Sequence, residues 1–381
     1  MKVAIFASAF APHVGGVEEL VRQLCLQYRS MDVDAYVITN QWPRMLKGHE
    51  TVDGIDVYRF PMRVPVGGMK ATLSYYATSG RIQRDIVNLV RSKGTDLLHI
   101  QCVSGTALYA CHCKQALGIP LVTTLQGELT MDAGKLFQTS RFARSFMTQS
   151  LQLADHVTGC SAQTLREAED FLGEPFESRG SVIFNGVRLA DFQNAQTYHH
   201  DRPYILGIGR HVPQKGFDVL IKAYADARDR FDHPTDLILA GDGVEHWNLV
   251  ALTRSLNIAD HVLMPGSVNH DVAVQMFRGS EFFVLSSRHE PFGIVNLEAM
   301  AAGKTVIATD VGGVAEYVTH EQNGLLIPAE NVEAMSQAMV RLTNDEALRN
   351  RMQREAAGFV TQFDWSRIAD AYAAIYRQLI G

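Results

Sequence analysis

Residues 286–303 read SSRHEPFGIVNLEAMAAG, and this stretch says most about the fold. It joins an apolar run at 282–286, typical of a buried strand, to a segment with the apolar spacing of a helix. Gly293 permits a tight turn between the two. The amides from Gly293 to Val295 would then point into a cleft from the start of the helix, which is a natural anion site. The stretch therefore predicts an α/β unit that binds a ligand at the strand-to-helix turn.

The same alternation of short apolar runs and longer amphipathic segments continues on both sides of this stretch. It predicts parallel sheets whose right-handed crossovers cover both faces. A polar stretch without periodicity at 190–202 divides the alternation into two series. Strands are expected at 3–8, 34–39, 97–101, 121–126, 156–160 and 182–184, and again at 204–209, 236–240, 262–264, 282–286, 305–309 and 324–327.

We therefore predict an α/β protein with two Rossmann-like, doubly wound parallel-sheet domains, residues 1–195 and 196–363. A length of 381 residues fits two domains of this class. An amphipathic helix, residues 364–381, ends the chain. Ligands are expected at the carboxyl ends of the strands, in a cleft between the domains.

The composition excludes several classes of protein. With 46% hydrophobic residues, the chain is not that of a disordered or fibrous protein. Its 35 basic and 41 acidic residues give a net charge of −6, whereas a nucleic-acid binder is usually strongly basic. No apolar run reaches the ~18 residues of a membrane span, and an odd number of cysteines, five, favours reduced thiols. We expect a cytoplasmic, uncleaved protein with no nucleic acid as partner.

Near matches to cofactor and metal motifs fail. The glycines at 207–209 follow a strand, but Val212 stands where a dinucleotide fingerprint needs its third glycine. Residues 303–305 resemble the end of a phosphate-binding loop, with helix and strand in the reverse order. His289 and His112 lack the partners of a zinc site. We expect no cofactor and no metal.

Charged residues cluster at two of the predicted strand ends. Glu290 and Glu298 lie on either side of the Gly293 turn, and each carboxylate can accept two hydrogen bonds from neighbouring sugar hydroxyls. The alternative is a surface Glu290 and a Glu298 that interacts with the helix dipole. Arg210 and Lys215 follow the strand at 204–209 and could neutralise a diphosphate. The alternative there is a loop of solvated charges.

Together these motifs resemble the retaining glycosyltransferases of family 4, which have the GT-B fold. The resemblance is very specific in the second half of the chain and looser in the first, where residues 12–18 resemble the family's first glycine-rich loop. The helix at 364–381 resembles the family's crossover helix, which packs back on the first domain. The segments that carry the resemblance are 209–216, 241–243, 290–298 and 312–313.

The resemblance implies a nucleotide-diphosphate sugar as donor, bound mainly by the second domain. Arg210 and Lys215 match the pair that binds the diphosphate, and Glu290 matches the carboxylate that contacts sugar hydroxyls. Glu298 matches the ribose-binding carboxylate, and Val268 matches the contact to the base. With Arg210, Lys215 and Glu290 as catalytic residues, the donor-binding set is Gly16, Gly209, Gly241, Val268, Phe292, Gly293, Ile294, Val295 and Glu298.

Catalysis in this interpretation is electrostatic. The two cations and the helix-end amides stabilise the leaving diphosphate, which is the work a metal does elsewhere. The acceptor hydroxyl enters on the face of the leaving group, so the resemblance implies retention without an enzyme nucleophile. The base stays open between uracil and guanine. The acceptor is a glycan, a lipid-linked molecule or a small molecule.

The first domain should hold the acceptor, because the donor motifs lie in the second. Gln126, where many relatives have histidine, can hydrogen-bond a sugar hydroxyl, and Glu128 either accepts a proton or is an ordinary loop carboxylate. His99 is an acceptor-side candidate or, more simply, a satisfied core histidine. Residues 135–151 mix aromatic and basic side chains, which indicates either a membrane-contacting face or a core helix.

Two other classes share this architecture. A GT-B nucleotide-sugar epimerase would perform different chemistry with the same domains. A non-catalytic nucleotide-sugar binding module would be expected to have lost one of Arg210, Lys215, Glu290 or Glu298, and all four are present.

Overall fold

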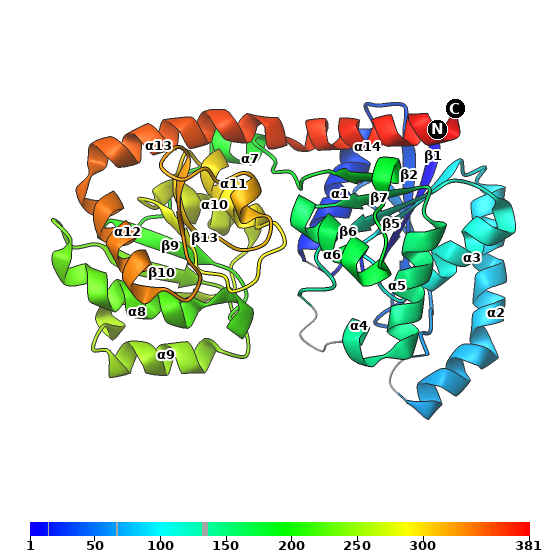
Figure 1. Cartoon of the computed structure of the whole chain (residues 1–381), viewed down its shortest axis with the longest axis horizontal. Coiled ribbons are helices and arrows are strands. Elements are labelled where there is room, and N and C mark those ends of the chain that lie inside the picture. Colours follow the sequence, from blue (N-terminus) through cyan, green and yellow to red (C-terminus); the bar gives the residue numbers. More distant parts are fainter. Residues whose placement is uncertain (14, 66–67, 132–135) are drawn as a thin grey trace. The chain divides into compact units, whose positions relative to one another are not determined.

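The structure, a computed structural model, describes residues 1–13, 15–65, 68–131 and 136–381. These residues form two compact units, shown in Figure 1. The first consists of Met1–Asn185 with Trp365–Gly381, and the second of Gly186–Asp364. No helix within the described ranges is long and apolar enough to cross a membrane.

The first unit is built on an eight-stranded sheet with the order β3-β4-β2-β1-β5-β6-β7-β8. Neighbouring strands are parallel, except that β3 and β4 form an antiparallel hairpin. The strands are β1 (Lys2–Ala7), β2 (Asp34–Asn40), β3 (His49–Val52), β4 (Ile55–Phe60), β5 (Leu97–Gln101), β6 (Leu121–Leu125), β7 (His156–Gly159) and β8 (Gly180–Val182). The helices are α1 (Gly16–Tyr28), α2 (Met69–Ser92), α3 (Ala107–Leu117), α4 (Leu136–Thr139), α5 (Arg141–Leu153), α6 (Ala162–Leu172) and α14 (Trp365–Ile380).

Both faces of this sheet are covered by helices. In β1, Ala4 and Phe6 pack into a core with α2, α3 and α5, whereas Val3 and Ile5 pack into a second core with α1 and α14. Side chains alternate between the faces of a strand, so a central strand that is buried on both faces must be apolar throughout. This explains why the central strands read as continuous apolar runs.

A buried polar chain attaches α14 to the first unit. His99 Nδ1 lies 2.5 Å from the hydroxyl of Tyr376, and His99 Nε2 lies 2.7 Å from the hydroxyl of Thr124. Tyr376 in turn lies 3.0 Å from the hydroxyl of Tyr28 on α1. His99 has no exposed surface, and burial lowers its pKa to about 3. The ring is therefore neutral and satisfied, in agreement with the core-histidine alternative, and it is not accessible to an acceptor.

The second unit is built on a six-stranded parallel sheet with the order β11-β10-β9-β12-β13-β14. Its strands are β9 (Tyr204–Ile208), β10 (Asp236–Ala240), β11 (Val262–Gly266), β12 (Phe283–Leu285), β13 (Val306–Thr309) and β14 (Gly324–Ile327). Its helices are α7 (Ala190–Gln193), α8 (Phe217–Ala227), α9 (His246–Ser255), α10 (His270–Gly279), α11 (Ile294–Ala301), α12 (Val332–Asn344) and α13 (Glu346–Phe359). Two parallel α/β sheets confirm the predicted fold class.

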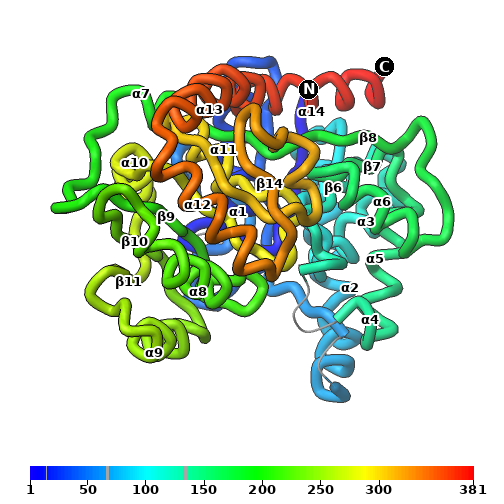
Figure 2. The backbone as a smooth tube through the Cα atoms, turned by 60° about the vertical axis from the view of Figure 1, so that its left-hand side comes forward, coloured from blue at the N-terminus to red at the C-terminus, as the bar shows by residue number. Residues whose placement is uncertain are grey.

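The direction of the chain reverses at the centre of the second sheet. From β9 the chain moves outward through β10 to β11, and it then returns to β12 on the other side of β9. Helices α8 and α12 lie side by side on one face (Figure 2), and α10 and α11 lie on the opposite face (Figure 1). In sheets of this kind, ligands bind beyond the carboxyl ends of the strands at such a reversal. The loops after β9 and β12 are the two that carry the charged motifs.

The polar stretch 190–202 packs on the second unit. The buried ring of Phe192 packs on Phe277, with 6.5 Å between ring centroids, and the Tyr198 amide donates to the Gln275 carbonyl at 2.9 Å. The division between the compact units falls before this stretch, between Asn185 and Gly186.

Replacing His99 by glutamine should weaken the pH dependence of stability. The ring of His99 must stay neutral in the fold, so folding is opposed once the unfolded chain takes up its proton, below about pH 6.5. Between pH 7 and pH 5, protonation of His99 in the unfolded chain lowers the free energy of unfolding of the wild type by roughly 2 kcal/mol. Chemical unfolding at both pH values should show that loss reduced in His99→Gln and unchanged in His112→Gln. An unchanged slope in His99→Gln would contradict the buried neutral ring.

Candidate functional site

A buried ion pair joins the loops that follow β9 and β12. Lys215 Nζ lies 2.5 Å from Glu290 Oε2, and the Ser287 hydroxyl donates to the same oxygen at 3.0 Å. Glu290 is only 7% exposed, so water screens the attraction between the two charges weakly. The structure thus brings together two side chains that belong to separate sequence motifs.

Glycines allow these two loops to reach backbone contact. Gly216 has a φ of +62°, and a Cβ at this position would lie 2.1 Å from the Ser286 carbonyl oxygen. The Ser286 hydroxyl donates to the Lys215 carbonyl at 2.8 Å. The loop after β13 approaches as closely, because a Cβ on its Gly312 would lie 2.0 Å from the carbonyl oxygen of Glu290. Any other residue at either glycine would push the loops apart.

The start of α11 faces the same region. Gly293, with a φ of +85°, caps the helix. The hydroxyl of the buried Tyr317 lies 2.6 Å from the Phe292 carbonyl oxygen and 3.0 Å from that of Gly293. The amides of Ile294 and Val295 lie in the first turn, where an α-helix has no internal acceptors for its donors. A helix start of this kind attracts anions.

Backbone contacts hold the loops after β9, β10 and β11 close together. A Cβ on Gly241, whose φ is +130°, would lie 1.8 Å from the Gly209 carbonyl oxygen. The Gly241 amide donates to the Gly266 carbonyl at 2.8 Å, and the His211 amide donates to the Asp242 carbonyl at 2.8 Å. The three loops therefore form one continuous edge.

The remaining donor-side candidates follow the strands β9, β11 and β12. Arg210 is exposed directly after Gly209. Val268 is half-buried after β11, and Glu298 is half-buried in the second turn of α11. These positions follow from the parallel strands, whose carboxyl ends meet at one edge of the sheet.

His211 is a residue of this edge that the sequence motifs did not single out. Its ring is fully buried and stacks on His246, with 5.3 Å between ring centroids and 3.2 Å between the two Nδ1 atoms. Burial, and next the proximity of His246, lower the pKa of His211, so the ring is neutral at neutral pH. A buried histidine next to Arg210 supports the loop without adding charge.

On the first unit, Glu128 is held by backbone amides. Its carboxylate accepts hydrogen bonds from the amides of Val103 and, at 2.7 Å, Gln126. These hydrogen bonds act to lower the pKa of the Glu128 carboxyl, but burial has the larger effect and raises it. Both oxygens are thus engaged in joining the loops after β5 and β6, which fits the alternative of a loop carboxylate. The Gln126 side chain is half-buried and accepts a hydrogen bond from Asn185 at 2.9 Å.

Gly16 begins α1 at the carboxyl end of β1 and is exposed. Among the residues that the structure describes, none apart from its chain neighbours and the backbone of its own helix would lie within 4 Å of a Cβ at this position. Val14, in the same glycine-rich loop, lies outside the described residues.

Two of the three aromatic side chains at 135–151, where a membrane-contacting face was one of two expectations, lie in the core of the first unit. Phe137, Phe146 and Met147 are buried in the core, and Phe137 packs on Phe146 with 5.7 Å between ring centroids. Phe142 is 42% exposed, which is too little apolar surface for a membrane face by itself. The segment is a core helix, α5, preceded by α4; Lys135 lies outside the described residues.

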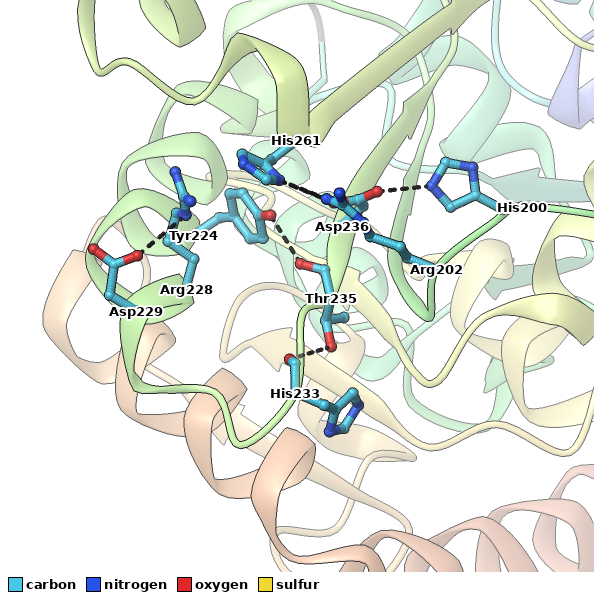
Figure 3. A network of polar contacts seen from close by, with 9 residues as sticks. All are labelled: His200, Arg202, Tyr224, Arg228, Asp229, His233, Thr235, Asp236 and His261. Atoms are coloured by element: carbon cyan, nitrogen blue, oxygen red, sulfur yellow. Dashed lines mark hydrogen bonds and ion pairs between the residues drawn. The ribbon is translucent and has the colours of Figure 1, made fainter.

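A separate polar network lies at the opposite edge of the second sheet (Figure 3). Asp236, the first residue of β10, is contacted by His200 at 3.0 Å, His261 at 3.2 Å and Arg202 at 3.3 Å. A cavity of about 360 Å³ adjoins it. Because this network is at the amino ends of the strands, it is not part of the candidate site.

The candidate site combines positive charge with hydrogen-bond acceptors. Lys215, the exposed Arg210 and the first-turn amides of α11 can bind a polyanion, while Glu290 and Glu298 can accept hydrogen bonds from hydroxyls. Within the part of the chain that the structure describes, no group of three or more His, Cys, Asp or Glu side chains is placed to hold a metal ion.

Comparison with known proteins identifies the family. Residues 190–359 match the family described as Glycosyl transferases group 1, and residues 14–191 match Glycosyltransferase Family 4. The chain is 33% identical to the alpha-D-kanosaminyltransferase of Streptomyces kanamyceticus, over 94% of this chain and 99% of that protein. The chain belongs to glycosyltransferase family 4. This family-4 protein is also 28% identical, over 100% of its length and 99% of the relative, to an uncharacterized glycosyltransferase of Methanocaldococcus jannaschii.

Solved structures confirm the GT-B fold of this family-4 glycosyltransferase over its full length. The sucrose-phosphate synthase of Thermosynechococcus elongatus matches with a TM-score of 0.81 at 22% identity, over 99% of this chain and 98% of that one. HepE of Anabaena, solved in complex with UDP-glucose, matches with a TM-score of 0.78 at 20% identity over 100% of both chains. Membership of family 4 makes the protein a glycosyltransferase of a retaining family, as the resemblance implied.

Replacing Gly216 by alanine should destabilise the second unit by about 1–3 kcal/mol. The added Cβ collides with the Ser286 carbonyl, and the left-handed φ strains any residue other than glycine. Gly358→Ala is the matched control, because it lies in α13 and, apart from the backbone of its own helix, no described residue comes within 4 Å of the new Cβ. Denaturant unfolding should show a loss for Gly216→Ala and none for Gly358→Ala. Equal stability of the two variants would contradict the backbone contact.

Proposed function

We propose that this glycosyltransferase transfers a sugar from a UDP- or GDP-linked donor to a hydroxyl of a glycan, a lipid-linked molecule or a small-molecule acceptor, with retention of configuration. The buried pair of Lys215 and Glu290 beside the start of α11 is the observation that carries the proposal. It unites a cation for the diphosphate with a carboxylate for sugar hydroxyls within 2.5 Å.

In the proposed reaction, the bond from the anomeric carbon to the diphosphate oxygen breaks, and its electron pair leaves with the diphosphate. Lys215, Arg210 and the amides of Ile294 and Val295 stabilise the negative charge that develops on the leaving group. The acceptor hydroxyl bonds to the anomeric carbon on the same face, and its proton passes to the departing diphosphate. Because Glu290 already holds Lys215 in place, little reorganisation is needed when the donor binds.

The remaining parts of the donor are assigned by position. We propose that Glu298 binds the ribose and that the loop at Val268 contacts the base. UDP is the first candidate, since HepE has been solved with UDP-glucose. The proposal needs neither a metal nor a cofactor. It places the reaction in the cytoplasm, which the five free cysteines support.

Incubation with a panel of UDP- and GDP-sugars should reveal slow release of the nucleoside diphosphate that persists in EDTA. Release is expected because water can replace the acceptor once the leaving group is stabilised, and the cations belong to the protein. Chromatography of the nucleotides measures it. Binding without release, even with candidate acceptors, would favour a non-catalytic module. A changed sugar on an intact donor would favour an epimerase.

Lys215→Ala and Glu298→Ala should each lower transfer by roughly 100-fold or more, while the fold is kept. Lys215 neutralises charge that grows in the transition state, and Glu298 anchors the donor. The control is Glu355→Ala, an exposed glutamate on α13 of the same unit. Initial rates and thermal unfolding of all three variants make the comparison. Near-normal turnover in Lys215→Ala or Glu298→Ala would overturn the assignment of that residue.

A further inference from the structure

Arg288 joins three loops at the carboxyl edge of the second sheet. Its guanidinium donates two parallel hydrogen bonds to the Asp218 carboxylate, at 2.9 and 3.0 Å, and a third to the Pro213 carbonyl at 2.6 Å. Its Nε donates to the carboxylate of Glu330, after β14. Its backbone amide donates to the Gln214 carbonyl at 2.7 Å.

These contacts lie on both sides of Lys215. Residues Pro213–Lys215 form a single 3₁₀ turn, and Asp218 lies in the first turn of α8 that follows. Arg288 itself stands two positions before Glu290 in the loop after β12. One side chain therefore connects the loop that carries Lys215 to the loop that carries Glu290.

The contact between Arg288 and Asp218 is of the strong, two-bonded kind. Burial by itself would raise the pKa of Asp218, but the hydrogen bonds and charge of Arg288 outweigh burial and lower it. The contact with Arg288 therefore favours the ionised form of the carboxylate. A guanidinium matches a carboxylate with two hydrogen bonds in fixed geometry, whereas a lysine ammonium is a point charge and cannot.

We propose that Arg288 is the positioning residue of the donor site, one that holds Lys215 at the distance from Glu290 needed to receive the diphosphate. The inference rests on the proposed function of Lys215. Four of the five guanidinium N–H groups are engaged by Asp218, Pro213 and Glu330, so Arg288 acts through Lys215 and not on the donor itself. Displacement of a charged group by about 1 Å is enough to reduce catalysis by about 100-fold.

The test is nucleotide binding by Arg288→Lys, measured by calorimetry with UDP or GDP, whichever the wild type binds. This variant keeps the positive charge but cannot form the two parallel hydrogen bonds to Asp218, so the Kd should rise by about 10-fold or more. Asp218→Asn breaks the same ion pair by removing the carboxylate, and it should also raise the Kd. This second variant tests the proposal if Arg288→Lys folds poorly. Arg341→Lys, an exposed arginine paired with Glu321 in the same unit, should leave the Kd unchanged.

A double-mutant cycle separates positioning from general support of the fold. In a Lys215→Ala background, Arg288→Lys should change the Kd by less than about 2-fold, because the group it positions is gone. Additive losses in the double variant, or a Kd in Arg288→Lys equal to that of the wild type, would overturn the proposal. If the wild type itself binds neither nucleotide, the proposed function fails, and that result is distinct from failure of Arg288.

Discussion

The close contact between the loops after β9 and β12 is the constraint on which the rest of the candidate site depends. These two strands are neighbours at the point where the strand order of the second sheet reverses, so their carboxyl ends lie side by side. Two features then allow the contact. Gly216 permits backbone contact with Ser286, and Ser286 returns a hydrogen bond to Lys215. Only with the backbones this close can Lys215 reach Glu290 and leave both charges largely out of water.

Both units contain buried polar side chains that are held by hydrogen bonds or ion pairs. In the second, charged side chains pair across the loops at the carboxyl ends of the strands. In the first, the neutral ring of His99 is satisfied inside the core by the hydroxyls of Thr124 and Tyr376, and the buried Arg59 pairs with Glu50 at 2.6 Å. The carboxylate of Glu128 accepts hydrogen bonds from the backbone amides of Val103 and Gln126.

Much of the fold could be predicted, because each central strand is buried on both faces and reads as an apolar run. The hairpin of β3 and β4 was missed, since the edge strand β3 has only four residues and β4 beside it alternates between apolar and polar side chains. A signal was present: Asp53 and Gly54 have φ angles of +49° and +74°, and Asp-Gly is a typical hairpin turn. Residues 190–202 looked like a linker because their few apolar side chains, such as Phe192, pack outside any regular period.

The sequence by itself determined which residues follow which strand, and so it placed Arg210 and Lys215 on one loop and Glu290, Gly293 and Glu298 on another. It also determined the family, since these motifs are local in the chain. The tertiary structure alone decided that Lys215 meets Glu290, 75 positions away, and that Arg288 spans the gap between their loops. The reason is physical: β12 pairs with β9 through hydrogen bonds between strands far apart in the sequence. No local pattern of residues specifies which strands become neighbours.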